Sequence, residues 1–426
     1  MHVAIFEPNN DGHRYTHIKR LLPVLHEATR QAGARLTFVT SREGAASPEY
    51  AAQIKGVEHL ASVDATMPFV KAADMNVTLA SFATHLRRVA HDLKADHILM
   101  PYADGTIQTV GMRRLTGRFS VPRGCEIEGL MMRGSFAYEQ GGGLKAALRP
   151  RAWLALTAAA PFRVIHHMDP IVVRALERRA PSLARRVRLI PDPVEPFDPP
   201  AHADARRSLG IPEDGRYVGC VGYQDRRKGI DLLIRAFLKA DLGPSNRLLL
   251  AGKQEQAIKD LLAGDAAGAV RDGRIVCLAR YISDEELRLG VAALDVVCTP
   301  YPPGAGHSGS SSIVIHAAGQ GRPSLGTDHG WVGDAITRFG LGWTCDVMDN
   351  AAFGSAIRRS MEAAPQFRLP ERGRRFVEFH RPDNFGACFT RRLRERLNLP
   401  PVQNLRDWAW VMETAAQAPA DANTRA

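Results

Sequence analysis

Short apolar runs alternate with helical patterns along most of this chain, and the alternation limits the fold more than any other feature. Runs typical of buried strands lie at His2–Phe6, Leu36–Thr40 and His97–Pro101. Between the first two, the stretch His17–Gln31 places Leu21 and Leu25 on one face of a helix. Strands that alternate with helices favour parallel pairing, because each helix carries the chain back along the sheet.

The alternation starts again after a proline-rich segment. Residues 190–200 contain five prolines in eleven positions, which precludes a continuous helix and limits strand pairing. Strand-like runs then follow at Tyr217–Val221, Arg247–Ala251, Ile275–Leu278, Val296–Pro300 and Pro323–Gly326, with an amphipathic helix at Lys228–Lys239. A chain of 426 residues exceeds what one hydrophobic core usually organises. We therefore predict an α/β protein with two Rossmann-like domains, at 1–190 and 191–380.

The composition is that of a globular chain without a membrane span. Its longest apolar-rich piece, near Trp153–Phe162, is about ten residues long, whereas a spanning helix needs roughly 18. The first residues, MHVAIFEPNNDGHRY, lack a basic head and a cleavage site, so they predict a strand and not a signal peptide. Six cysteines without a Cys-x-x-Cys pair argue against a zinc site or a disulfide framework and favour reduced thiols in a cytoplasmic protein.

The charge balance is basic, at +11, and the excess arginine gathers in the first half of the chain. Arg149–Arg151 and residues 174–188 are dense examples. Such charge attracts an anionic membrane face or a nucleic acid, although a solvated helix surface gives the same pattern. No basic motif interleaved with aromatic residues is present, so nucleic acid is the weaker candidate. Peripheral contact with the inner face of a membrane stays open.

Two loops of the second domain are candidates to bind a phosphate. The segment GYQDRRKG, Gly222–Gly229, joins a strand to a helix and brings Lys228, Arg227 or Arg226 near backbone N–H groups. The segment 306–323 places small residues before an apolar helix, which lets a ligand approach the unpaired N–H groups of its first turn. The candidates there are Ser308, Gly309, Ser310, Ser311, Ser312 and His316. A solvated basic turn and ordinary serine caps are the alternatives.

Polar residues also follow two predicted strands of the first domain. Gly12 and His13 come after the first strand, and His13 is a candidate general base because its ordinary pKa lies near neutrality. Asp104 follows the strand that ends at Pro101, where ligands of open parallel sheets collect. His166 and His167 are neighbours in sequence and rarely converge on one ion, so we predict no metal site.

The order and spacing of the segments from Val218 to Asp334 resemble the donor-binding half of a GT-B glycosyltransferase of the retaining family-4, or group 1, type. The Lys228–Gly229 helix start and the Gly-x-Pro element at Gly321–Pro323 carry this resemblance. It implies two Rossmann-like domains that face each other across a cleft. It further implies that helices in 381–416 cross back to the first domain, with Trp408 and Trp410 as candidate anchors. Residues 417–426 are small and polar and are expected to be disordered.

The resemblance also implies an activity. The chain would be a metal-independent glycosyltransferase without a cofactor, which moves a sugar with retention from a nucleotide-diphosphate sugar to a carbohydrate, lipid or small-molecule acceptor. His13 and Asp104 would act on the acceptor. The residues that would meet the donor are Gly12, Tyr223, Arg227, Lys228, Ser308 to Ser312 and His316. Tyr281 and Ile282, at the end of a predicted strand, would also meet it.

Three positions depart from the family pattern. The family has an arginine where this chain has Tyr223, and two glutamates eight residues apart where it has Ser308 and His316. His316 can still form a hydrogen bond to a ribose, whereas Ser308 supplies no carboxylate. Two alternatives therefore stay open: a GT-B-like protein that binds a nucleotide or sugar with impaired catalysis, and an inverting transferase that uses His13 as its base.

Overall fold

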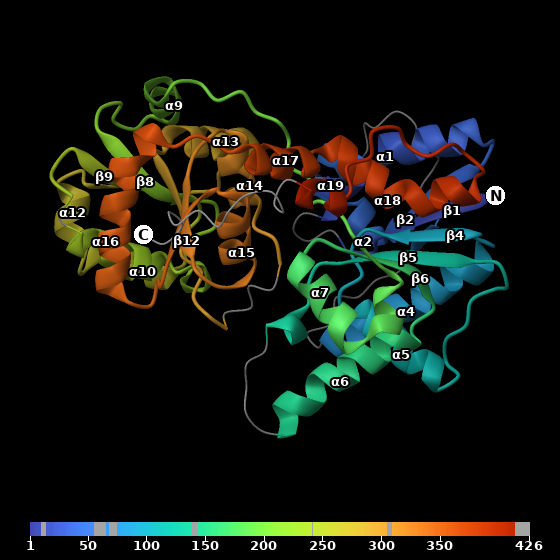
Figure 1. The fold of residues 1–426 in the computed structure, drawn as a ribbon. Helices are drawn as coiled ribbons and strands as arrows, with labels where there is room; N and C mark the ends of the chain where they lie inside the picture. Colours follow the sequence, from blue (N-terminus) through green and yellow to red (C-terminus); the bar gives the residue numbers. More distant parts are fainter. Residues whose placement is uncertain are drawn as a thin grey trace. The chain divides into compact units, whose positions relative to one another are not determined.

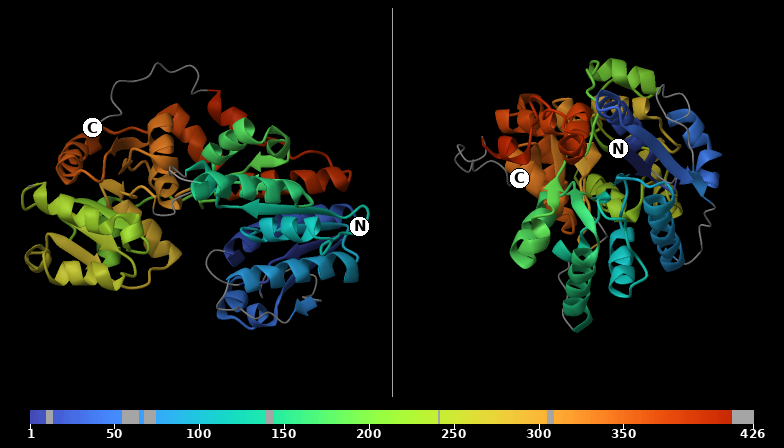
Figure 2. Two further views of the ribbon diagram at one scale, coloured as in Figure 1. Left: turned by 90° about the horizontal axis from the view of Figure 1, so that it is seen from below. Right: turned by 90° about the vertical axis from the view of Figure 1, so that its right-hand side faces the viewer.

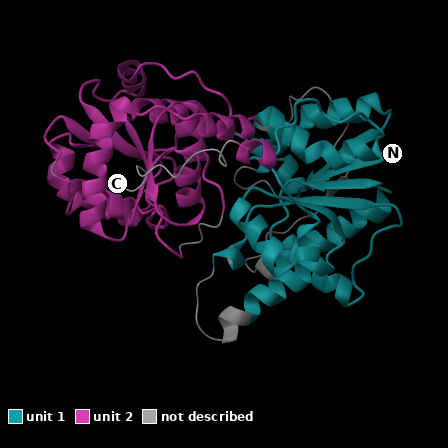
Figure 3. Cartoon of the chain, viewed as in Figure 1, with its two compact units in different colours: residues 1–193, 382–407 teal, residues 194–381, 408–426 magenta. Residues whose placement is uncertain are grey.

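The computed structural model describes residues 1–9, 14–54, 65–67, 75–138, 144–240, 242–304 and 309–413. The chain forms two compact units, coloured separately in Figure 3. Unit 1 comprises residues 1–193 and 382–407, and unit 2 comprises residues 194–381 and 408–426. Each unit has its own parallel sheet and its own hydrophobic core.

The sheet of unit 1 has seven strands in the order β3-β2-β1-β4-β5-β6-β7. They are β1 His2–Phe6, β2 Arg35–Ser41, β3 Ala65–Met67, β4 His97–Met100, β5 Glu126–Met131, β6 Phe162–His167 and β7 Val187–Leu189. Val3 of β1 pairs in parallel with Leu36 on one side and His97 on the other. The order of the strands reverses between β1 and β4, and such a switch point is where open parallel sheets bind ligands.

Helices cover both faces of this sheet (Figures 1 and 2). They are α1 Arg14–Gln31, α2 Arg42–Ala45, α3 Pro48–Gln53, α4 Met75–Asp92, α5 Thr106–Leu115, α6 Leu144–Ala159, α7 Pro170–Arg179, α8 Pro181–Ala184 and α18 Pro382–Arg396. On one face, Leu22 of α1 and Phe385 of α18 share a buried apolar cluster. On the other face, Leu86 of α4 and Val110 of α5 belong to a second cluster.

The sheet of unit 2 has six strands in the order β10-β9-β8-β11-β12-β13, all parallel. They are β8 Arg216–Val221, β9 Asn246–Ala251, β10 Ile275–Leu278, β11 Val296–Thr299, β12 Ser324–Thr327 and β13 Gly342–Cys345. The helices are α9 His202–Leu209, α10 Ile230–Lys239, α11 Gln256–Ala263, α12 Ala267–Arg271, α13 Asp284–Ala293, α14 Ser312–Gly319, α15 Gly330–Phe339, α16 Asn350–Ala363, α17 Glu371–Phe379 and α19 Trp408–Met412. The order of these strands reverses between β8 and β11.

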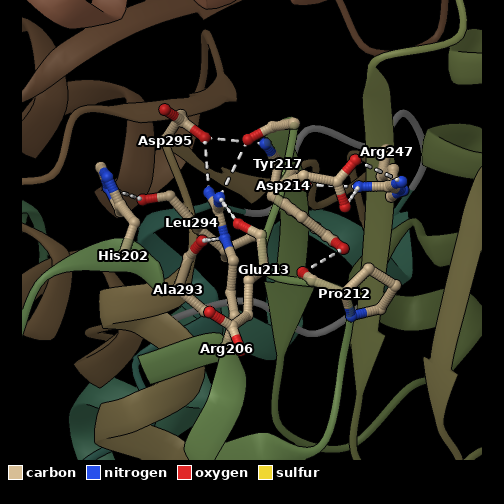
Figure 4. Close-up of polar contacts among 11 residues, drawn as sticks. His202, Arg206, Pro212, Glu213, Asp214, Tyr217, Arg247, Ala293, Leu294 and Asp295 are labelled. Atoms are coloured by element: carbon tan, nitrogen blue, oxygen red, sulfur yellow. Dashed lines mark hydrogen bonds and ion pairs between the residues drawn. The ribbon is translucent and has the colours of Figure 1, made fainter. Parts of the chain in front are cut away.

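A buried arginine fixes the amino-terminal edge of this second sheet (Figure 4). Arg206 of α9 is 4% exposed and donates hydrogen bonds to the carbonyl oxygens of Ala293, Glu213 and Gly215. It also pairs with Asp295 at 3.1 Å. The same carboxylate oxygen of Asp295 accepts the N–H of Tyr217 at 2.7 Å. One side chain thus joins α9, the end of α13 and the start of β8.

The predicted α/β fold class is confirmed, with some differences in detail. β10 ends at Leu278, so Tyr281 and Ile282 lie in the loop that follows and not at the end of a strand. The helix expected from Lys228 begins at Ile230, because Gly229 adopts a φ of 67° after a short 3₁₀ turn. Residues 417–426 lie outside the described residues.

The expected anchor role of the two tryptophans is wrong. Trp408 packs within unit 2, with its ring centroid 5.6 Å from that of Phe339 and 5.3 Å from that of Phe379. Trp410 lies under the guanidinium of Arg375, also in unit 2. The residues that hold α18 in unit 1 are different, since Arg392 of α18 pairs with Glu126 at 2.6 Å.

Among the described helices, none is both long enough and apolar enough to cross a membrane. The six cysteines are free thiols, and Cys220, Cys298 and Cys345 are buried. Burial raises the pKa of Cys298 well above its ordinary value, so this thiol stays protonated and behaves as a core side chain.

Candidate functional site

Two loops meet at the switch point of unit 2, beyond the carboxyl ends of β8 and β11. A Cβ added at Gly229 would lie 1.9 Å from the carbonyl oxygen of Pro300, so the loop after β8 and the loop after β11 touch there. Gly229 also has a φ of 67°, a conformation that disfavours any other residue. The position therefore requires glycine, and it fixes Lys228 directly beside the switch point.

Lys228 is held in place by its own turn. The buried carboxylate of Asp225 accepts the backbone N–H of Lys228 at 2.9 Å. The ammonium nitrogen of Lys228 lies 3.5 Å from the point where a Cβ of Gly222 would stand, so the charge sits above the end of β8. Arg227 pairs with Asp225 at 2.7 Å through a largely exposed side chain. Lys228 is thus placed over the strand end, and Arg227 pairs with the residue that caps the turn.

The loop after β8 continues the sheet beyond its last strand residues. Gln224 is fully buried and donates from its side chain to the carbonyl oxygen of Gly222 at 2.8 Å. Its backbone forms a parallel bridge with Gln254 in the loop after β9. A Cβ at Gly252 would lie 1.9 Å from the carbonyl oxygen of Gly222, so these two loops also pack without space for a side chain.

The residue at the N-cap of α14 does not cap the helix with its own side chain. Ser311 occupies the N-cap position, but it makes no capping hydrogen bond. Its hydroxyl instead lies 3.1 Å from that of the buried Tyr301, whose pKa burial raises. Gly309 has a φ of 146° and Ser312 is exposed. The N–H groups at this helix start are therefore suited to an anion, with the positive end of the helix dipole behind them.

His316 lies one turn further along α14 and lines a cavity. The cavity has a volume of about 370 Å³ and is bounded by α14, by residues 194–198 and by the end of α17. The backbone N–H of Val194 donates to the carbonyl oxygen of His380 at 2.9 Å, which closes one side. The structure thus places His316 beside the segment that leads into unit 2, while Ser308 lies outside the described residues.

The two tyrosines expected at the donor are solvent-exposed. Tyr223 is 40% exposed, in the position where the family has an arginine, and Tyr281 is 81% exposed. The side chain of Ile282 packs in an apolar cluster, so only its backbone is available to a ligand. The loop after β12 adds a hydroxyl–imidazole pair, since Thr327 Oγ1 lies 2.6 Å from His329 Nδ1. Which of these groups meets a donor stays a prediction.

In unit 1, Asp104 joins two loops. Its Oδ1 accepts the backbone N–H groups of Met132 and Arg133 at 3.1 and 3.0 Å, beyond the end of β5. Burial raises the pKa of Asp104 to about 6. Gly12 and His13 lie outside the described residues, so their roles stay predictions.

Sequence reasoning missed an ion pair at the switch point of unit 1. Glu7 directly follows β1, is fully buried, and pairs with Arg14, the first residue of α1, at 2.8 Å. The guanidinium carbon of Arg14 lies 3.7 Å from the ring centroid of Tyr102 in the loop after β4. A glutamate at the end of an apolar run is the one sequence signal that pointed here, and it does not reveal its partners.

The two neighbouring histidines have separate roles. His166 Nε2 lies 2.9 Å from the buried Glu128, which also lies 2.8 Å from His97 Nε2. His167 Nδ1 accepts the backbone N–H of Asp169 at 3.0 Å. Within the described part of the chain, no group of three or more histidine, cysteine or acidic side chains is arranged to hold a metal ion.

Comparison with known proteins identifies the fold and a family pattern in the second unit. Residues 215–363 match the sequence model of the family Glycosyl transferases group 1. The search of curated protein sequences gave no significant match. Sucrose-phosphate synthase from Thermosynechococcus elongatus is similar in structure, with 20% identity, a TM-score of 0.63 and coverage of 98% of this chain and 97% of that one.

Two further solved structures share the architecture. WaaG, a glycosyltransferase involved in lipopolysaccharide biosynthesis, has 14% identity and a TM-score of 0.58, with coverage of 98% of this chain and 99% of its own. Alr3699/HepE from Anabaena, solved with UDP, has 13% identity and a TM-score of 0.60, with 98% of both chains covered. The chain therefore has the GT-B fold, and its residues 215–363 carry the sequence pattern of the Glycosyl transferases group 1 family.

Proposed function

We propose that the protein is a glycosyltransferase that moves a sugar from a nucleotide-diphosphate sugar to an acceptor hydroxyl. The observation that carries this proposal is the switch point of unit 2, where the Lys228 ammonium stands over the end of β8 beside the loop that leads into α14. A departing nucleoside diphosphate develops negative charge, and a fixed cation together with helix N–H groups stabilises that charge more in the transition state than in the ground state.

The finer parts of the proposal rest on chemistry and resemblance. We propose retention, because the leaving phosphate itself can take the acceptor proton when no carboxylate stands at Ser308. No metal is invoked, since Lys228 and the first turn of α14 supply the positive charge. His316 would contribute one hydrogen bond to the ribose from the wall of its cavity. HepE was solved with UDP, which makes uridine donors the first to try.

The test combines binding with turnover. UDP, GDP and ADP, and their sugar conjugates, are titrated against the wild type, Lys228→Ala and a control, Lys239→Ala, which removes an exposed lysine at the other end of α10. Loss of a charge-assisted hydrogen bond costs about 1.5–3 kcal/mol, so Lys228→Ala should weaken binding roughly 10- to 150-fold. Lys239→Ala should bind as the wild type does. If none of the nucleotides binds or is turned over with any acceptor, the proposal is wrong.

A second candidate, nucleotide binding without turnover, is favoured by Tyr223 and His316 in place of charged residues of the family. It predicts a rise in melting temperature with nucleotide but no consumption of the donor sugar, and indifference to His13→Ala. An inverting transferase with His13 as base would be distinguished by the anomeric configuration of its product.

A further inference from the structure

A second cluster of polar side chains, formed by Glu7, Arg14 and Tyr102, lies in unit 1. It lies at the switch point of the seven-stranded sheet, since Glu7 follows β1 and Tyr102 lies two residues beyond the end of β4. These two strands are neighbours in the sheet, with Val3 opposite His97. Groups beyond their carboxyl ends stand where ligands of open parallel sheets bind.

The guanidinium of Arg14 is fixed from two directions. Its Nη1 donates to Glu7 Oε1 at 2.8 Å, and its guanidinium carbon lies 3.7 Å from the ring centroid of Tyr102. The Arg14 side chain remains 14% exposed. Glu7 is its one ion-pair partner among the described residues, and that bond uses a single one of the five guanidinium N–H groups.

Glu7 is costly to keep as a purely structural anchor. Its side chain is fully buried, and its Oε2 has no hydrogen-bond partner in the described part of the chain. Burial raises its pKa to about 7 despite the nearby Arg14. Buried ion pairs are weak contributors to stability, because the loss of solvation offsets the attraction. A carboxylate of this kind does better as a group that orients an arginine.

We propose that Arg14 binds an oxyanion on the acceptor, either a phosphate monoester or a carboxylate. A planar guanidinium that spends one N–H group on Glu7 has further N–H groups to offer, and two of them match two oxygens of such a group in paired, charge-assisted hydrogen bonds. The stacked Tyr102 keeps the plane of the guanidinium fixed, so little side-chain entropy is lost on binding. The assignment of this anion to an acceptor rests on the proposed function.

Asp104 adjoins the same cluster. Asp104 lies two residues after Tyr102, in the same loop beyond β4. Burial and then the Asp104 carboxylate raise the pKa of Tyr102. An oxyanion held by Arg14 would therefore bring a hydroxyl of the same molecule close to Asp104. The cluster thus offers one group to hold the acceptor and one to orient the hydroxyl that reacts.

The test measures binding of glucose 6-phosphate, glucuronate and uncharged glucose by isothermal titration calorimetry in a buffer without phosphate. The wild type should bind one or both anions and not glucose, and the preferred anion tells phosphate from carboxylate. Arg14→Ala should weaken that binding roughly 10-fold or more, as expected for loss of a charge-assisted pair. Arg30→Ala is the matched control in the same helix, since Arg30 pairs with Glu27 on an exposed surface, and it should bind as the wild type does.

Arg14→Lys covers the case in which the alanine variant does not fold. It keeps the charge but loses the planar fork, so it should bind the anion more weakly than the wild type. Equal binding by Arg14→Lys and the wild type, equal binding of glucose and the anions, or loss of anion binding in Lys228→Ala but not in Arg14→Ala would each overturn the inference. If UDP, GDP and ADP fail to bind in the nucleotide titration, the proposed function is wrong. The anion titration contains no nucleotide, so its result is read independently.

Discussion

Two adjacent arginines of α9 allow a direct test of what stabilises unit 2. Arg206 and Arg207 both pair with carboxylates, but the Arg206 side chain is 5% exposed and that of Arg207 is 62% exposed. Replacing Arg206 by methionine keeps the apolar part of the side chain and removes the donor of the bonds in Figure 4 to the carbonyl oxygens of Ala293, Glu213 and Gly215. The contrast isolates burial from the mere presence of an ion pair.

The magnitude follows from what is left behind. Without Arg206, three carbonyl oxygens lose their donor, that of Ala293 in a buried bond, and Asp295 keeps its bond from the N–H of Tyr217. Breaking a buried pair by removal of one partner costs roughly 3–5 kcal/mol. At an m-value of about 2.5 kcal/mol per molar, the urea midpoint of unit 2 should fall by roughly 1–2 M. Burial also lowers the pKa of Arg206, which agrees with a charge held mainly by these bonds.

The assay is equilibrium unfolding in urea, followed by far-ultraviolet circular dichroism. Arg207→Met is the control, and its midpoint should match that of the wild type, because its pairs with Asp204 and Glu213 are open to water. Arg206→Met should still bind nucleotide when folded, since the network lies at the amino-terminal edge of the strands and the site lies at the carboxyl ends. Equal midpoints for the two variants would refute the reasoning from burial.

Three further predictions concern pH and backbone space. Burial raises the pKa of Glu128, but its two histidine partners outweigh burial and hold the pKa at about 2. The stability that Glu128 contributes is therefore present above pH 4.5 and is lost as the pH falls towards 2. In Glu128→Gln the melting temperature should depend less on pH over that range than in the wild type, and an equal pH dependence would contradict this. The stability contributed by Glu7 depends on pH in the opposite direction, because the pKa of Glu7 is raised from 4.5 to about 7 and this stability is lost as the pH rises through 7. Glu7→Gln should therefore have a higher melting temperature than the wild type at pH 8 but not at pH 4. Gly229→Ala should lower the melting temperature and weaken nucleotide binding, because its Cβ would lie 1.9 Å from the carbonyl oxygen of Pro300. Gly243 also has a positive φ, of 75°, but lies in open space, so Gly243→Ala should lose only the roughly 1–2 kcal/mol that a left-handed backbone costs.

The alternation of strands and helices was enough to predict the fold. Period and length identified β1, β4, β8 and β9 closely, because buried parallel strands are nearly continuous apolar runs. The segment 190–200 between the two alternating patterns was recognisable for a different reason, since its prolines exclude regular structure. The assignment of Tyr281 and Ile282 to a strand failed because the apolar run continued past Leu278, where the strand ends.

The site was predicted less well, because it depends on contacts between distant residues. The sequence named Lys228 but could not show that Arg227 folds back onto Asp225. It suggested serine caps for α14, whereas Ser311 is turned to Tyr301, ten residues earlier. The Glu7–Arg14 pair follows from the closure of a loop, which no periodic pattern reports.

A nucleoside diphosphate should bind at the switch point of unit 2. The most direct test is a crystal structure of the full chain with whichever of UDP, GDP and ADP binds most tightly. The account predicts that the phosphates lie within hydrogen-bond distance of Lys228 Nζ and of the backbone N–H groups at the start of α14, with the ribose towards His316. A nucleotide that occupies any other surface and leaves Lys228 without a phosphate contact would contradict it.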